Sequence, residues 1–275
     1  MEVLRKIIKN PSAVIGFIIM FFLLIICLIG PLFIQSPYSQ NTAIKLSSPG
    51  GDHLLGTDEF GRDVLSRLVV GARYSISVGF FSVILALMCG LLMGSIAGYF
   101  GKIWDKIIMA FCDILLAFPS VLLSISIAIV LQPGIYTPML AVGISSIPLF
   151  TRLVRAQFMT LRDLPFIDAI RSSGAGDLRI IFFHLFPNSM GPIIVQSTLR
   201  IGSSILLAAT LNFLGLGAQP PTPEWGSMLN NARPYLWVAP YLGIFPGLAI
   251  TITVIGFNLI GDTLRDYLDP RMRTL

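Results

Sequence analysis

"DAIRSSGAGDLRIIFFHLFPN", residues 168–188, is a charged, glycine-broken stretch in a chain that is otherwise mostly apolar. Of the 275 residues, 55% are hydrophobic and 12% are charged, whereas roughly 25% of the residues of a soluble protein are charged. A soluble domain of this size could not bury so much apolar surface. We therefore expect a membrane protein, in which the net charge of +5 reports loop orientation rather than a nucleic-acid partner.

Six apolar stretches are long enough to cross a bilayer, which takes about 20 helical residues. They are residues 12–34, 75–99, 107–131, 137–154, 193–216 and 238–260. We expect the first to be retained, because it is too long for the core of a cleaved signal peptide and no small-x-small cleavage site follows it. The sequence predicts an all-α integral membrane protein in which one transmembrane domain, residues 12–275, follows a short segment, residues 1–11.

The lysines and arginines are distributed unequally between the two sets of loops. With the N-terminus in the cytoplasm, most of them fall on the cytoplasmic side, as the positive-inside rule requires. This orientation places both termini and residues 155–188, the cytoplasmic segment, on the inner side of the membrane. The opening stretch is therefore predicted to lie in the cytoplasm.

The pattern of the cytoplasmic segment predicts a short helix, a glycine hinge and a second helix. Asp163 can cap the first helix, Pro165 suits its first turn, and Gly174 offers a left-handed stop. Asp177 can cap the second helix, and Pro187 discourages its continuation. A two-turn helix is marginal in water, so we expect it to dock either on its own spans or in a groove of another protein.

The opening stretch resembles the EAA motif of the membrane subunits of bacterial binding-protein-dependent ABC importers. Asp168, Ala169 and Ile170 stand at the Glu-Ala-Ala positions, Gly174 matches the motif glycine and Pro187 matches its proline. The departures are aspartate for glutamate, isoleucine for the second alanine, and phenylalanine for the leucine before the proline.

Three further stretches narrow this resemblance to the second permease subunit of the dipeptide, oligopeptide and nickel branch. They are "HLLGTDEFGRDVLSRLVVGARYSISVG" (53–79), "FLGLGAQPPTPEWGSML" (213–229) and "FNLIGDTLRDYLDPR" (257–271). The resemblance implies a MetI-like permease fold with six transmembrane helices in the bacterial cell membrane. It also implies as partners a second permease, two cytoplasmic ATPase subunits that hold ATP and Mg, and an extracytoplasmic substrate-binding protein.

The resemblance also implies that the cytoplasmic segment supplies a coupling helix, which rests in a cleft of an ATPase subunit. The residues that it assigns to this coupling contact are Asp168, Ala169, Ile170, Arg171, Gly174 and Ala175. Arg171 is either a salt-sensitive rim contact or a solvated side chain.

Three polar residues in or beside the spans are candidates for the translocation path, since polar groups near mid-membrane usually face protein or water. Arg200 is the deepest of them and either faces the path or pairs within the fold. Asp113, near a cytoplasmic end, is either a gate residue or exposed to solvent. Asn212 lies in the fifth span.

Small residues and a proline predict close packing and a kink. Gly90, Gly94 and Gly98 form a G-x-x-x-G-x-x-x-G row, which allows another helix to approach closely. We expect this row to pack within the subunit rather than against the partner permease. Pro119 is expected to kink the third span, because it lacks an N–H donor.

The sequence contains no recognisable catalytic or nucleotide-binding motif. It has no phosphate-binding pattern G-x-x-x-x-G-K-[ST], and its two histidines, His53 and His184, are predicted on opposite sides of the membrane. We expect no catalytic site, metal site or bound cofactor. The leading prediction is a permease subunit for ATP-driven import of di- or oligopeptides; the alternatives are nickel or a metal-chelator complex as cargo, a self-contained secondary transporter or channel, and a membrane-embedded enzyme.

Overall fold

A computed structural model describes residues 10–268, and every regular element in this range is a helix. The five long helices, each apolar and long enough to cross a membrane, are α2 (Pro11–Leu28), α3 (Val64–Phe100), α6 (Thr137–Arg162), α9 (Phe186–Phe213) and α11 (Tyr241–Leu268). The remaining α-helices are α4 (Lys102–Leu116), α5 (Ser120–Leu131), α7 (Pro165–Ser172), α8 (Asp177–Ile180) and α10 (Trp225–Ala232). Most of the predicted segment 1–11 lies outside the described residues.

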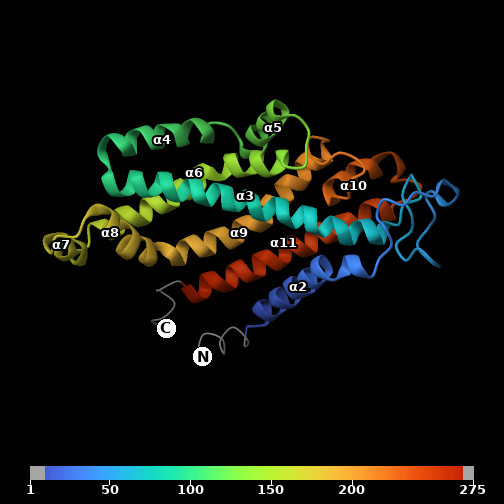
Figure 1. The fold of residues 1–275 in the computed structure, drawn as a ribbon, viewed down its shortest axis with the longest axis horizontal. Helices are drawn as coiled ribbons and strands as arrows, with labels where there is room; N and C mark the ends of the chain where they lie inside the picture. The colour runs from blue at the N-terminus through green and yellow to red at the C-terminus, as the bar shows by residue number, and fades with distance from the viewer. Residues whose placement is uncertain (1–9, 269–275) are drawn as a thin grey trace.

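The long helices run side by side and give the molecule two distinct ends (Figure 1). At one end, called the α7 end, α7 and α8 lie beyond the close of α3 and α6; at the other, called the loop end, the connections 33–63 and 214–240 gather. The N-terminal end of α2 and the C-terminal end of α11 are both directed toward the α7 end (Figure 1). Both described ends of the chain therefore run toward the side on which α7 and α8 lie.

The third expected span, residues 107–131, is two helices in the structure. α4 and α5 meet at a bend of 90°. Pro119 is the N-cap of α5, with an extended backbone (φ −52°, ψ 132°), and proline also disfavours a helical conformation at the residue before it. The proline thus breaks the span, where the sequence predicted a kink.

The second span starts earlier than expected, at Val64 rather than near residue 75. Asp63 caps this helix, because its carboxylate accepts a 2.7 Å hydrogen bond from the Ser66 amide. Arg67 is buried in the added turns, and its guanidinium donates to the carbonyls of Pro37 and Pro221. Tertiary partners for a charged side chain, which hydropathy does not register, allow the helix to begin here.

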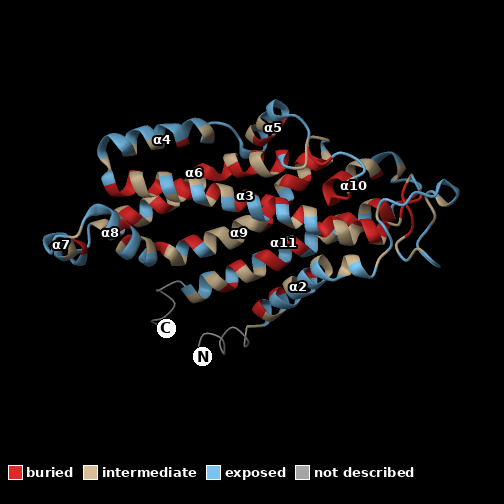
Figure 2. Ribbon diagram, viewed as in Figure 1, coloured by how far each residue is buried: buried red, intermediate tan, exposed pale blue. Residues whose placement is uncertain are grey.

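The glycine row of α3 packs closely against α6. A Cβ added at Gly94 would lie 2.7 Å from the Cβ of Val154, and one added at Gly98 would lie 2.7 Å from the Cβ of Phe158. Gly90 faces α6 in the same way. Figure 2 shows the buried residues concentrated where α3, α6 and α9 face one another, whereas α4 is largely exposed. The structure therefore places the glycine row inside the subunit.

Candidate functional site

The part of the cytoplasmic segment that follows α6, residues 163–188, is called the coupling segment here, because the resemblance assigns the coupling contact to it. Leu164, in an extended conformation, is the N-cap of α7, and Pro165 occupies its first position. Asp163 is not the cap that the sequence predicted: it closes α6 as the C-cap, and its carboxylate pairs with Arg162 at 3.0 Å. A proline-led start does not require a side-chain cap, because proline lacks one of the N–H groups that would otherwise need an acceptor.

Gly174 ends α7 in the left-handed conformation that its sequence position predicted, with φ +85°. A Cβ added there would meet nothing within 4 Å, so the position needs glycine for its backbone angle and not for space. The N-cap of α8 is Gly176, one residue before the predicted cap, Asp177. The carboxylate of Asp177 instead accepts a 2.5 Å hydrogen bond from the hydroxyl of Tyr99, at the end of α3.

Pro187 does not stop the second helix, which corrects the sequence prediction. The chain continues from α8 through a π-helical turn, Ile181–Leu185, directly into α9, and Pro187 lies near the α9 N-terminus. At that position the missing N–H costs little, and the wider π turn supplies the local adjustment. A proline that usually ends a helix is therefore tolerated within a longer helical run.

The inner side of the coupling segment is an apolar anchor. Ile167, Ile180 and Leu185 are completely buried and pack against Val154 and Phe158 of α6. The two motif residues that pack partly buried against the same cluster are Ile170 and Ala175. The isoleucine that departs from the EAA pattern thus faces the fold and contributes to packing.

The outer side of α7 presents the remaining motif residues to solvent. Ala169 and Gly174 are exposed, and the side chains of Asp168 and Arg171 are 71% and 49% exposed. Arg171 Nη1 lies 3.6 Å from Asp168 Oδ1. A hydrogen bond to the nearby phenol of Tyr99 raises the pKa of Arg171 above its ordinary value.

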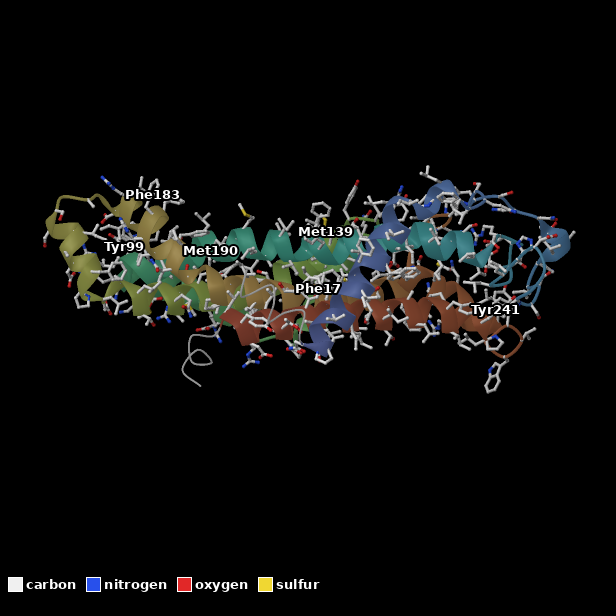
Figure 3. All side chains as sticks on the ribbon, turned by 90° about the horizontal axis from the view of Figure 1, so that it is seen from below. Phe17, Tyr99, Met139, Phe183, Met190 and Tyr241 are labelled. Carbon is white, nitrogen blue, oxygen red and sulfur yellow. The ribbon has the colours of Figure 1, made fainter. Side chains whose placement is uncertain are left out.

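Of two residues that anchor the coupling segment, only one could be predicted from the sequence. Ile167 belonged to an apolar stripe at helical spacing, which is the signal for a buried face. Tyr99 lies in a different span and carried no such signal. Figure 3 shows Tyr99 at the α7 end and Tyr241 at the opposite end of the molecule.

The structure separates the three candidate path residues. Arg200 is half-buried in α9, and its guanidinium donates to Ser146 Oγ from Nη2 at 2.9 Å and from Nε at 3.3 Å. Asp113 pairs with Arg152 at 2.6 Å, and both side chains are at least half exposed. Asn212 is 2% exposed. Its side-chain nitrogen donates to the Ala208 carbonyl, and its side-chain oxygen accepts from the Ala218 backbone amide. Asn212 therefore stabilises the turn that follows α9.

Comparison with known proteins identifies the family. The family model described as "Binding-protein-dependent transport system inner membrane component" matches residues 90–274. This chain belongs to that family. A second model, the N-terminal TM domain of oligopeptide transport permease C, matches residues 1–49 of the permease.

Curated relatives place the permease in the peptide branch. It is 47% identical to the dipeptide transport system permease protein DppC of Alkalihalophilus pseudofirmus, over 99% of this chain and 90% of that protein. It is 49% identical to the glutathione transport system permease protein GsiD of Pectobacterium atrosepticum, over 82% of this chain and 75% of that protein. These relatives are permease subunits, which confirms the prediction of a non-catalytic membrane component of an ABC importer.

A solved structure confirms the predicted fold. The permease matches a chain of the MetNI methionine ABC transporter, in an inward-facing conformation, with a TM-score of 0.58 and 18% identity. The match covers 74% of the permease and 96% of that chain. The MetI-like arrangement of transmembrane helices is therefore common to both.

The loop end of the permease holds a buried ion cluster. Asp58 is shared by Arg62 Nε at 2.6 Å and Arg67 Nε at 3.4 Å, and all three residues are at most 5% exposed. Burial raises the pKa of the neighbouring Glu59, although Arg62 lies 3.3 Å from its carboxylate. This cluster fixes the loop before α3 to the first turns of that helix.

A second buried carboxylate at the loop end joins α3 to α10. Glu224 accepts hydrogen bonds from Ser75 Oγ at 2.7 Å and from the Ser227 amide at 2.8 Å, which caps α10. Burial raises the pKa of Glu224 above its ordinary value. Within residues 10–268, no group of three His, Cys, Asp or Glu side chains is arranged to hold a metal ion.

Proposed function

We propose that the permease forms, with a second permease subunit, the path by which short peptides enter the cell. The observation that carries this proposal is the identity of nearly half to relatives named for dipeptide and glutathione transport, one of them matched along almost the whole chain. Both named cargoes are short peptides, which favours peptides over nickel or a metal chelate. The same relationship favours an ATP-driven subunit over a self-contained transporter or channel.

The coupling contact is assigned to the outer side of α7. Asp168, Ala169, Arg171 and Gly174 are exposed there, while Ile167 holds the helix to its own spans from the other side. A helix that is anchored on one side and exposed on the other can transmit a conformational change of a bound subunit to α6 and α9. The partner that drives this change is an ATPase subunit holding ATP and Mg, since the chain has no phosphate-binding motif of its own.

The orientation follows from the arrangement of the ends. The α7 end, toward which the N-terminal end of α2 and the C-terminal end of α11 are directed (Figure 1), is assigned to the cytoplasm. The loop end is assigned to the side of the extracytoplasmic binding protein. The lysine and arginine bias of the loops supports this choice. Arg200 and Asp113 are placed along the path, Arg200 deep in the membrane and Asp113 close to its cytoplasmic mouth.

Reconstitution tests the proposal. Proteoliposomes that contain the permease, its partner permease and both ATPases should accumulate a labelled dipeptide only when ATP and the binding protein are present. A Walker A lysine substitution in the ATPases is the matched control and should abolish uptake. Uptake that persists without ATP, or uptake of nickel alone, would contradict the proposal.

Two substitutions test the coupling surface. Asp168→Lys reverses an exposed charge, and Gly174→Pro prevents the left-handed backbone at φ +85°. Both should reduce ATPase co-purification and ATP-dependent uptake. Ser126→Ala, at an exposed position in α5, is the control, and equal behaviour of all three variants would refute the assignment.

A further inference from the structure

Arg200 is a membrane-embedded cation whose charge is not neutralised by the described part of the chain. It lies midway along α9, and within residues 10–268 no carboxylate comes within 4.0 Å of its guanidinium. The buried arginines at the loop end differ, because Arg62 and Arg67 share Asp58. A charge at this depth is costly and is normally paired or in contact with water. Water or a group from outside the described residues must therefore compensate the charge of Arg200.

Ser146 orients this guanidinium and leaves one edge of it open. The serine oxygen accepts from Nε and from Nη2, at 3.3 and 2.9 Å. Arginine has five N–H donors in a planar fork, so the edge formed by Nη1 and the second N–H of Nη2 remains available. Two parallel N–H groups on such an edge match the two oxygens of a carboxylate.

Helix geometry shows which way Arg200 faces. Successive helical residues are about 100° apart, and Ile205, five residues on, packs against Gly79 of α3. Arg200 therefore lies on a side of α9 turned away from α3. Its bond to Ser146 reaches α6, whereas Leu199 packs against α11. The guanidinium sits in the sector between α6 and α11.

Other polar side chains share this sector. Gln196 and Ser203 lie one turn before and one turn after Arg200, and Ser203 is exposed. From α11, the exposed side chain of Asn258 approaches α9 beside Gly202, at the same depth. Polar groups gathered at one depth of otherwise apolar spans indicate a water-accessible surface rather than a lipid-facing one.

We propose that Arg200 binds the carboxylate of the peptide as it crosses the membrane, with Ser146 holding the guanidinium in position. This inference rests on the proposed function. A peptide with a free C-terminus carries at least one carboxylate at neutral pH, because the pKa of this group is about 3.5. The bound carboxylate supplies the missing counter-charge, and its departure into the cytoplasm returns Arg200 to its starting state. The permease, and not only the binding protein, thereby selects for an anionic end of the cargo.

Uptake of a dipeptide is compared with uptake of the same dipeptide amidated at its C-terminus, using the reconstituted importer and one binding protein throughout. The ratio of acid to amide uptake is measured for each permease variant, so that the preference of the binding protein cancels between variants. Arg200→Gln should lower this ratio by about tenfold, as expected for loss of a bidentate charged contact. Arg200→Lys keeps the charge without the fork and should give an intermediate ratio. Arg233→Gln, at the loop end, is the matched arginine control and should leave the ratio unchanged.

A second measurement removes the binding protein altogether. Calorimetric titration of the purified importer in nanodiscs, with the acid and amide peptides at millimolar concentration, should show heat of binding only for the acid, and none for the Arg200→Gln importer.

An unchanged uptake ratio in an assembled Arg200→Gln importer would overturn the carboxylate site and leave the proposed function intact. Loss of the partner permease from both Arg200 variants would also overturn it, because the counter-charge would then belong to that partner. Absence of ATP-dependent uptake of either peptide by the unaltered importer would instead refute the proposed function.

Discussion

The hydroxyl of Tyr99 donates a 2.5 Å hydrogen bond to the carboxylate of Asp177. This bond joins the last turn of α3 to the first residue of α8 and spans 78 residues of sequence. The whole of α7 and its glycine stop lie just before Asp177. The coupling segment is therefore held to α3 by this bond as well as to α6 and α9 by the apolar anchor.

Removing that bond should loosen the coupling segment. Tyr99→Phe retains the ring and deletes the donor, and we expect it to destabilise the permease by about 1 kcal/mol, the usual net value of one hydrogen bond. Thermal unfolding of the detergent-purified protein measures the loss, and the ratio of transported peptide to hydrolysed ATP should fall with it. Tyr136→Phe, at a side chain that is 70% exposed, is the control; equal effects of the two variants would show that the bond carries no coupling.

Neighbouring residues of α7 should separate anchoring from docking. Ile167 is fully buried, whereas Phe166 is 39% exposed. Ile167→Ala should speed amide hydrogen exchange in residues 165–172, because it removes buried contacts worth about 2–5 kcal/mol. Phe166→Ala should leave exchange unchanged and weaken ATPase co-purification. Faster exchange in Phe166→Ala would contradict this division of roles.

The glycine row should tolerate no side chain. Gly94→Ala places a Cβ 2.7 Å from both the Thr151 carbonyl oxygen and the Val154 Cβ, and overpacking of this kind costs about 1–3 kcal/mol. Gly247→Ala in α11 is the matched control, since its Cβ would meet nothing within 4 Å. Thermal unfolding should show a lower midpoint for Gly94→Ala alone. A midpoint equal to that of the unaltered permease would mean that α3 and α6 are not in contact there.

Stability should depend on pH through Glu224. Burial raises its pKa, so the folded protein retains the proton at higher pH than the unfolded chain does. Protonation therefore stabilises the fold, and this contribution is lost as the pH rises from the ordinary glutamate pKa of 4.5 through the raised value. Glu224→Gln should show a smaller fall in unfolding temperature between pH 5 and pH 8. Asp52→Asn, at an exposed loop position, should retain the full pH dependence; no difference between the two variants would rule out this role.

Local signals predicted the coupling segment only in part. Pro165 and Gly174 act within one turn of the backbone, and both were placed correctly, because their φ preferences do not depend on distant residues. Asp163 and Asp177 were assigned as caps, yet each carboxylate found another partner. A carboxylate can accept from many donors, so its partner depends on which of them the fold brings near.

The sequence by itself determined that this chain is a helical membrane protein, because long apolar runs have no other way to satisfy their backbone in lipid. The family motifs, which are spread over most of the chain, added that it is a permease and indicated its branch. Only the tertiary structure decided that Gly90, Gly94 and Gly98 face α6, that Ile170 packs inward, and that Arg200 has Ser146 as its hydrogen-bond partner. These outcomes depend on the rotation of each helix about its axis, which is set by packing against residues far away in the chain.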